Sequence, residues 1–330
     1  MNYKRLTRFL GLKVVRLIIL LIIVAAVSFI LVDMSPIDPV KSYLANMVVT
    51  SDQVERLNSY WGVGQPLSTK IINWVSSVFQ GDLGTSLIFR APVTEVIADR
   101  FTASLALMFT SWLISGVLGF ILGIIAAMKR GSIIDKAIKV YCYILQSAPT
   151  FWLALIFLIV FSVQLGWFPT GLGVPVGVNS SDVSIFDLVY RLILPAFTLS
   201  LLGVAQIAMY TRDKLNSVLS EEYITFSKVR GESEWGIIKN HGIRNILLPA
   251  VTLQFLSFSE LFGGAVLVEQ VFSYPGLGQA AVSAGLRSDI PLLLGIVIFS
   301  TIFVFCGNAI ADLIYKFVDP RIRESERDEI

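Results

Sequence analysis

Long apolar stretches recur along this chain, and they decide what it can fold into. Each is about 20 residues or longer, the length that a helix needs to cross the hydrocarbon core of a bilayer. Hydrophobic residues make up 55% of the 330 residues, charged residues only 15%, and the mean hydropathy is +0.74. A water-soluble protein is therefore excluded, and the sequence predicts an all-α polytopic membrane protein.

Six membrane helices are predicted. A basic N-terminal end precedes the first span, and no small-residue cleavage site follows it, so we interpret this span as an uncleaved anchor. Because basic residues are retained inside, both termini are predicted to be cytoplasmic. The six spans are Leu12 to Val32, Leu105 to Met128, Val140 to Leu165, Leu192 to Tyr210, Leu247 to Val268 and Leu292 to Tyr315.

The third stretch is too long for one upright helix. Its 26 residues, Val140 to Leu165, would extend about 39 Å, against a hydrocarbon core of about 30 Å. Dividing it at Pro149 would give seven spans and would place the basic loop around Lys228 outside. We therefore expect one long helix that is tilted or kinked at Pro149.

Residues 33–100 form a long outer segment between the first two spans. Asp52 and Glu55 are typical of a helix start, and a second helix is indicated by an apolar face that ends before Gly81. That face comprises Leu67, Ile71, Trp74, Val75 and Val78. We expect a folded segment that packs on the outer mouth of the protein. It either rests on the membrane interface or provides a docking surface for a partner.

The loop between the fourth and fifth spans, residues 213–248, is charged and amphipathic. Its basic residues predict that it faces the cytoplasm. Its apolar residues have helical spacing on both sides of Gly231, so two short helices that are broken at this glycine are expected. The residues concerned are Tyr223, Phe226 and Val229, then Trp235, Ile238 and Ile243. A simple connection needs neither this length nor this amphipathicity, so the hairpin is predicted to grip a soluble partner.

Motifs for catalysis are lacking in the sequence. It contains no GxxxxGK(S/T) phosphate loop, no HExxH and no nucleophile elbow. His241 is the one histidine, and Cys142 and Cys306 lie within apolar spans, so neither a metal site nor a disulfide framework is expected. We predict that the chain is not an enzyme and that it binds no cofactor, metal or nucleic acid.

Three segments outside the hairpin carry long motifs: residues 262–291 (FGGAVLVEQVFSYPGLGQAAVSAGLRSDIP), 312–323 (DLIYKFVDPRIR) and 80–87 (QGDLGTSL). They resemble the oligopeptide/dipeptide/nickel permease family of ABC importers. Within the hairpin, the order of Tyr223, Gly231, His241, Asn245 and Leu248-Pro249 is similar to that of the family's cytoplasmic loop. With Asp38-Pro39 and the long outer segment, the chain looks like the B-type member of the usual pair.

The resemblance implies an architecture and a set of partners. The type I ABC importer core of five helices would occupy residues 101–318, with an additional N-terminal helix in residues 1–32 and a cytoplasmic tail in residues 319–330. The partners would be a homologous C-type permease subunit, two ATP-binding subunits that hold ATP and Mg, and an extracytoplasmic substrate-binding protein, all at a bacterial inner membrane. The residues implied to contact the ATPase subunits are Glu222, Tyr223, Phe226, Ser227, Arg230, Gly231, Trp235, His241 and Pro249.

Polar residues inside the spans are candidates for a translocation pathway, because each must find a partner or water. Glu260, predicted near mid-membrane in the fifth span, either lines the route or makes a structural hydrogen bond to a neighbouring helix. The weaker candidates are amides, which often only link helices. They are Gln206, Gln254 and Asn308.

An aromatic turn follows the fifth span and is predicted to lie at the outer interface. It is either a turn with an aromatic anchor or an outer gate of the pathway. Its residues are Phe272, Tyr274, Pro275 and Gly276. Glu269, near the outer end of the span, is expected to be solvated or tied to this turn.

The predicted function is that of a permease subunit of an ATP-driven importer for di- or oligopeptides. The chain would form half of the translocation pathway and would couple it to the ATPase subunits. Nickel or another metal chelate is the alternative cargo within the same family. An ion-coupled secondary transporter is the alternative from another class; Glu260 could couple the ion, but the sequence shows no inverted repeat.

Overall fold

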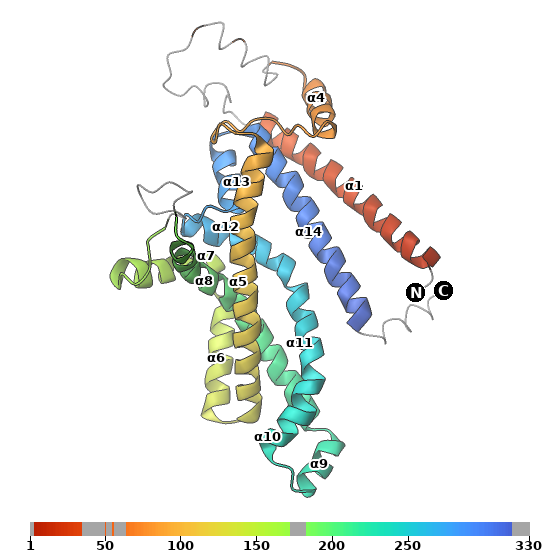
Figure 1. Ribbon diagram of the computed structural model, residues 1–330, viewed down its shortest axis with the longest axis vertical. Coiled ribbons are helices and arrows are strands. Elements are labelled where there is room, and N and C mark those ends of the chain that lie inside the picture. Colours follow the sequence, from red (N-terminus) through yellow and green to blue (C-terminus); the bar gives the residue numbers. More distant parts are fainter. Residues whose placement is uncertain (1–2, 35–49, 51–54, 56–63, 172–182, 319–330) are drawn as a thin grey trace. The chain divides into compact units, whose positions relative to one another are not determined.

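The computed structural model describes residues 3–34, 50, 55, 64–171 and 183–318, and these residues are almost entirely helical (Figure 1). In the described ranges, the one feature with strand geometry is an isolated bridge between Thr85 and Pro92. Four helices are long and apolar enough to cross a membrane, and two bent pairs of helices raise that number to six if each pair is one span. The predicted all-α membrane fold is confirmed. Asp52 and the tail, residues 319–330, lie outside the described residues.

The chain divides into two compact units, which we describe separately. The first comprises residues 1–103 and 275–306, and the second comprises residues 104–274 and 307–330. Two long helices, α5 (Val93–Met128) and α14 (Ile290–Val318), begin in the first unit and end in the second. Each unit is therefore built from segments that are far apart in the sequence.

In the first unit, an outer helix packs on the first span. The first span lies in α1 (Tyr3–Asp33), most of whose described side chains are exposed, as expected of a helix that faces lipid. The outer helix is α4 (Leu67–Phe79), which ends two residues before Gly81, where φ is +82°. Trp74 on α4 meets Phe29 on α1 edge to face, with ring centroids 5.2 Å apart. The predicted helix and its end are confirmed, and its apolar face contacts α1.

A buried carboxylate organises the outer loop of the first unit. Asp289, which lies between α13 (Leu277–Leu286) and α14, is fully buried. Its Oδ2 accepts hydrogen bonds from Ser86 Oγ at 2.6 Å, from the amide of Leu87 at 2.8 Å and from the amide of Ile88 at 3.0 Å. The segment QGDLGTSL is thereby fixed to the start of α14.

The predicted third span is two helices rather than one. α6 (Ile133–Ser147) is capped by Ser132 and ends at Ala148, whose backbone is extended (φ −88°, ψ 132°). The residue before a proline is disfavoured in the helical region, and Pro149 follows. α7 (Thr150–Phe157) and the wider η1 (Leu158–Gln164) continue at 107° to α6. The predicted bend at Pro149 is confirmed, but the chain breaks there into two helices instead of continuing as one.

Close packing of small residues joins the helices of the second unit. A Cβ atom on Gly123 of α5 would lie only 2.6 Å from the carbonyl oxygen of Ala208 on α8 (Ile185–Leu219), and one on Gly119 would lie 2.9 Å from that of Val204. Glycine is needed here because it lets the two backbones approach closely. An apolar cluster joins α6, α7 and α8: Cys142, Leu145, Leu153, Leu201, Ala205 and Ala208.

The predicted fifth span is also broken. α11 (Arg244–Leu256) and α12 (Phe258–Val271) meet at Ser257 with a bend of 57°. The hydroxyl of Ser257 donates to the carbonyl of Gln254 at 2.9 Å, a local bond that competes with the regular helix pattern. The expected continuous helix from Leu247 to Val268 is thus corrected to two segments.

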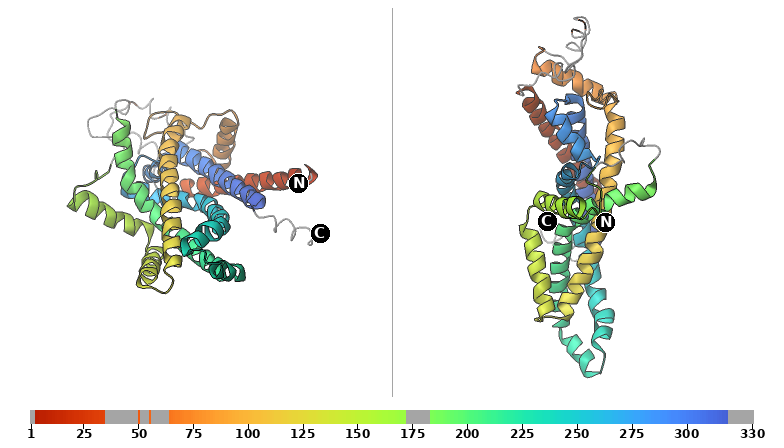
Figure 2. Two further views of the ribbon diagram at one scale, coloured as in Figure 1. Left: turned by 60° about the horizontal axis from the view of Figure 1, so that its bottom comes forward. Right: turned by 90° about the vertical axis from the view of Figure 1, so that its left-hand side faces the viewer.

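A helical hairpin connects α8 to α11. It consists of α9 (Glu222–Val229), α10 (Glu234–Ile237) and η3 (Ile238–Ile243). In the right-hand view of Figure 2, it extends past the end of α6 that lies nearest to it. Like η1, η3 is a π-helical turn, a rare and wider form of helix that is frequent at functional sites.

Candidate functional site

The hairpin turns where the sequence predicts it. α9 ends at Arg230, and Gly231 follows with φ of +83°, a left-handed conformation that glycine adopts without strain. Ser233 then caps α10, because its Oγ accepts a hydrogen bond from the amide of Gly236 at 3.1 Å. The predicted break at Gly231 is confirmed.

The hairpin has a buried face and an exposed apolar surface. The side chains packed inside are Ile224, Ser227, Ile237 and Ile238, whereas Ile243 is half-buried. The large side chains of the predicted apolar face are exposed instead: Tyr223 by 43%, Phe226 by 70%, Val229 by 81% and Trp235 by 57%. We call these four residues the hairpin surface. Large apolar side chains are thus gathered at the exposed end of this hairpin.

A polar network holds the two arms of the hairpin together. Glu232 accepts hydrogen bonds from Asn240 Nδ2 at 3.0 Å and lies 3.3 Å from Nε2 of the half-buried His241. The His241 ring meets the ring of Tyr223 edge to face, with centroids 6.0 Å apart, and Asn245 Nδ2 donates to the Tyr223 hydroxyl at 3.3 Å. The hydrogen bond from Asn240 is the main reason why the pKa of Glu232 lies below its ordinary value.

Sequence reasoning found Tyr223 and His241 but missed Glu232 and Asn240. Glu232 precedes α10 and is not part of a helix, so helical periodicity does not relate it to Asn240, eight positions further along the chain. The one sequence signal for Glu232 was its position directly after Gly231, where the chain turns between the two arms of the hairpin. The remaining implied contact residues are spread over the hairpin and beyond it: Glu222 and Arg230 are exposed, and Pro249 lies inside α11.

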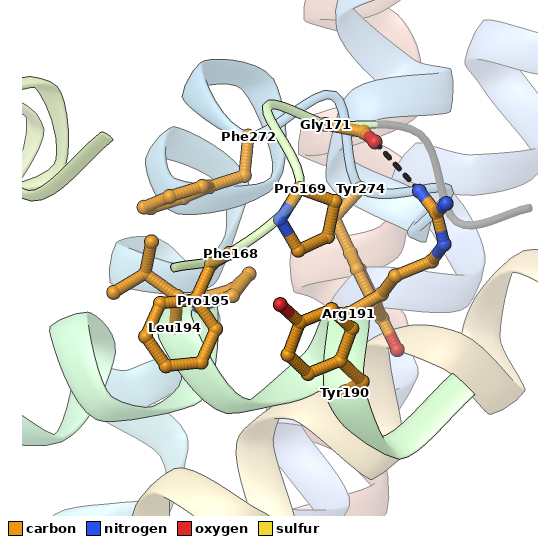
Figure 3. Close-up of a pocket in the computed structure, with 9 residues that line it drawn as sticks. All are labelled: Phe168, Pro169, Gly171, Tyr190, Arg191, Leu194, Pro195, Phe272 and Tyr274. Carbon is orange, nitrogen blue, oxygen red and sulfur yellow. Dashed lines mark hydrogen bonds between the residues drawn. The ribbon is translucent and has the colours of Figure 1, made fainter. Parts of the chain in front are cut away.

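The aromatic turn after α12 packs into the second unit (Figure 3). Phe272 and Tyr274 line a small cavity of about 10 Å³, room for about one water molecule. The other lining residues are Phe168, Pro169, Gly171, Tyr190, Arg191, Leu194 and Pro195. Arg191 Nη1 donates to the carbonyl of Gly171 at 3.0 Å, which fixes the loop over the cavity. Burial and the carboxylate of Glu269 raise the pKa of Tyr274 to about 12.

The other half of this turn belongs to the first unit, where Gly276 is buried and precedes α13, directly after the half-buried Pro275. Glu269 is 1% exposed and accepts a hydrogen bond from Ser104 Oγ at 2.5 Å, so the expected solvated carboxylate is wrong. Its carbonyl accepts the amide of Tyr274 at 2.9 Å, which ties it to the turn as expected. An aromatic anchor is therefore present, and a role as a gate stays a prediction.

Glu260 lies in the first turn of α12, three residues after the bend at Ser257. Its side chain is exposed, and no partner for its carboxylate is found among the described residues. The positive end of the helix dipole favours a carboxylate at this position. Gln206 on α8 and Asn308 on α14 are exposed as well.

Gln254 connects two helices of the second unit. It is buried, and its Nε2 donates to the carbonyl of Trp112 and to Ser115 Oγ, both on α5. In return, the indole of Trp112 donates to the carbonyl of Gln254 at 2.7 Å. Gln254 thus links α5 and α11, a role typical of amides within a membrane, and its place in a translocation pathway stays a prediction.

An apolar groove of about 340 Å³ lies beside this link, between α5, α8 and α11. Its walls include Phe120, Ile207 and Val251, and Gln254 closes one side. In the described part of the chain, no three His, Cys, Asp or Glu side chains lie close enough to hold a metal ion. The groove and the hairpin surface are therefore the features that offer contacts to other molecules.

The sequence matches two family models and is similar to known transport proteins over most of its length. Residues 119–324 match the model described as binding-protein-dependent transport system inner membrane component, and residues 6–108 match the model of the N-terminal part of such components. The chain is 35% identical over 300 residues to the oligopeptide transport system permease protein AppB of Bacillus subtilis, covering 91% of this chain and 94% of that protein. It is also 35% identical over 312 residues to the glutathione transport system permease protein GsiC of Escherichia coli, with 94% and 97% covered.

Proposed function

The chain belongs to the family of binding-protein-dependent transport system inner membrane components, and on this basis we propose that it is the membrane-spanning permease subunit of an ATP-driven peptide importer. The names of both relatives support peptides as the cargo, since one is an oligopeptide permease and the other a glutathione permease. Di- and oligopeptides are accordingly the proposed substrate class, in preference to nickel chelates.

The observation that carries this proposal is the hairpin surface. Four large apolar side chains are exposed on a hairpin that the Glu232 network and the turn at Gly231 hold in one shape. Contact with another protein would remove these side chains from water. Two cytoplasmic ATP-binding subunits are the partners that family membership supports, and ATP and Mg would bind to them rather than to this chain.

The proposed mechanism transmits movement from the hairpin to the membrane. Closure of the ATP-binding subunits would push on the hairpin, which leads directly into α8 on one side and α11 on the other. These helices would open and close the route towards the outer turn. Alternating access also requires the two states to bind the substrate with different affinity. A homologous C-type permease would complete the pathway, and an extracytoplasmic binding protein would deliver the peptide.

Glu260 would line this route. A carboxylate that faces lipid at mid-membrane costs about 2.5–3.5 kcal/mol or more, so water or the second permease chain must surround it. The ammonium terminus of a peptide has the opposite charge and would be attracted to it. The exposure of Glu260, in the middle of a broken span, supports this role.

Uptake into proteoliposomes tests the function. The chain, its partner permease, the ATP-binding subunits and the binding protein are reconstituted, and uptake of labelled alanine peptides of two to six residues is measured. We expect uptake only when ATP and Mg are supplied on the side of the ATP-binding subunits. Uptake driven by an ion gradient without ATP would favour a secondary transporter. Uptake of a nickel–histidine chelate but of no peptide would assign the cargo to metal chelates.

We expect Glu260→Gln to reduce uptake of trialanine about fivefold, the effect of roughly 1 kcal/mol of lost attraction, while basal ATP hydrolysis persists. The matched control is N-acetylated trialanine, which has no ammonium group and should be carried equally by both proteins. Unchanged uptake of free trialanine would place Glu260 outside the route. Failure of the complex to assemble would give this side chain a structural role.

Labelling of single cysteines tests the orientation in a Cys306→Ser background. Ser233→Cys, on the exposed turn of the hairpin, is expected to react with a membrane-impermeant reagent only from the cytoplasmic side. Ser180→Cys, outside the described residues, is expected to react only from the opposite side. Reaction of both from one side would contradict the proposed topology of an inner membrane protein with cytoplasmic termini.

A further inference from the structure

One ion pair in the second unit is not used by the mechanism described so far. Asp135, in the first turn of α6, has a side chain that is 1% exposed, and that of Arg212 on α8 is 13% exposed. Arg212 Nε donates to Asp135 Oδ1 at 2.6 Å, and Nη2 donates to Oδ2 at 2.9 Å. A two-pronged pair of this kind fixes the orientation of two helices as well as their distance.

Neighbouring groups complete this ion-pair site. The amide of Gly131, in the loop between α5 and α6, donates to Asp135 Oδ2 at 2.9 Å, and Lys139 Nζ lies 3.9 Å from the same oxygen. On the other side, Arg212 Nη1 donates to the exposed Asp213 at 2.7 Å. The Asp135 carboxylate is thus held by α8, by its own helix and by the preceding loop.

Stability alone does not explain such a pair. Removing two charges from water costs about as much as their attraction returns, and apolar side chains of similar size often stabilise a fold equally well. α6 and α8 are already joined by the apolar cluster that contains Cys142 and Ala205. The pair instead fixes the register of α6 against α8 at one end of α6.

The position of Arg212 connects this pair to the hairpin. Leu215, three residues further along α8, is fully buried and touches the returning arm of the hairpin: a Cβ atom on Gly242 would lie 2.8 Å from Leu215 Cδ1. Leu215 also packs with Ala127 and Ile246 in a second apolar cluster. A movement of the hairpin that reaches Leu215 therefore reaches Arg212, about one helical turn away.

From Asp135, the same movement can continue along α6. α6 leads through Pro149 into α7, and α7 packs against both α8 and α12, the helix that carries Glu260. We propose that the Asp135–Arg212 pair makes α6 and α7 follow the hairpin as one body, so that both residues are positioning residues for transport. This inference rests on the proposed function, in which the hairpin is the part that the ATP-binding subunits move.

Uptake per ATP hydrolysed tests the proposal in the reconstituted complex, with the alanine peptide that the wild type carries fastest. Asp135→Asn is expected to lower this ratio roughly tenfold while ATP hydrolysis continues. Arg212→Lys should lower it too, because lysine keeps the charge but loses the two-pronged geometry. Asp135→Asn combined with Arg212→Gln should be no worse than either change alone, since both remove one interaction. If the double variant instead lowers uptake per ATP by the combined effect of the two single changes, the proposal is overturned.

Two further variants separate positioning from folding. Asp99→Asn makes the same chemical change at an exposed carboxylate of α5, outside the ion-pair site, and is expected to leave the ratio unchanged, so it is the matched control. Asp135→Leu combined with Arg212→Met replaces the pair by apolar side chains, which should keep the packing and let the complex assemble. We expect the same loss of uptake per ATP in this variant. A normal ratio would overturn the proposal.

A measurement that needs no substrate distinguishes this inference from the proposed function. Spin labels are attached to exposed positions on the two helices by Lys136→Cys and Lys214→Cys, with Cys306→Ser to remove the exposed native thiol. The distance distribution between the labels should be narrow in the otherwise unchanged chain and clearly broader after Asp135→Asn. Equal widths would overturn the pair's positioning role, whether or not peptides are carried. Absence of ATP-dependent uptake of every alanine peptide would refute the proposed function instead.

Discussion

Replacing Gly231 by valine is expected to lower peptide uptake at least tenfold while the chain still inserts into the membrane and the complex still hydrolyses ATP. The φ angle of +83° is strongly disfavoured for a β-branched residue, and a strain of about 1–3 kcal/mol would move the backbone out of this turn. The next residue, Glu232, would then lose its contacts with Asn240 and His241. The measurement is uptake per ATP hydrolysed in the reconstituted complex.

The control for this prediction is Gly231→Asn. Asparagine tolerates the left-handed conformation far better than valine does, and a Cβ atom at this position would meet nothing within 4 Å. Gly231→Asn should therefore keep most of the uptake. Equal loss in both variants would mean that the side chain, rather than the backbone angle, is what the site rejects. Normal uptake in the valine variant would contradict the role given to the turn.

A second large effect is expected from Gly123→Ala. The added methyl group would lie 2.6 Å from both the carbonyl oxygen of Ala208 and Cβ of Thr211, so α5 and α8 would have to separate. Overpacking of this kind costs about 1–3 kcal/mol, and the midpoint of thermal unfolding should fall by roughly 5 °C. The midpoint is followed by the tryptophan fluorescence of the purified chain in detergent.

Gly263→Ala is the matched control for the change at Gly123. Gly263 lies within α12, and a Cβ atom on it would meet nothing within 4 Å. Because alanine favours a helix over glycine by up to about 1 kcal/mol, this variant should unfold at the same temperature as the wild type or slightly higher. Similar midpoints of thermal unfolding for Gly123→Ala and Gly263→Ala would show that α5 and α8 leave room for a methyl group at residue 123.

Features that depend on neighbouring residues could be predicted from the sequence. The spans follow from apolar length, the end of α4 from Gly81, and the hairpin turn from Gly231, since glycine permits the positive φ found at both positions. The break at Pro149 had a signal too, because the preceding residue is driven out of the helical region. The break at Ser257 had none, as neither proline nor glycine adjoins it.

Features that depend on contacts between distant residues could not be predicted. Spacing alone showed that the hairpin has an apolar face, but not that Ile224 would turn inward and Phe226 outward. The bond between Gln254 and Trp112 joins residues that are 142 positions apart in the sequence. The same holds for Asp135 and Arg212, which are 77 residues apart in the sequence. Such pairs are set by tertiary packing, which no local pattern encodes.

The π-helical turn of residues 238–243 has a consequence for the length of the chain. A wider turn accommodates one residue more than an α-helix does, and it does so locally, so that the helices on both sides keep their faces. Loss of one residue within this turn would simply tighten it to an ordinary α-helical turn. The same loss in α11, ahead of Gln254, would rotate all later residues by about 100° and move Gln254 away from Trp112. The hairpin can therefore vary by one residue during evolution at this place without disturbing the phase of the span that follows.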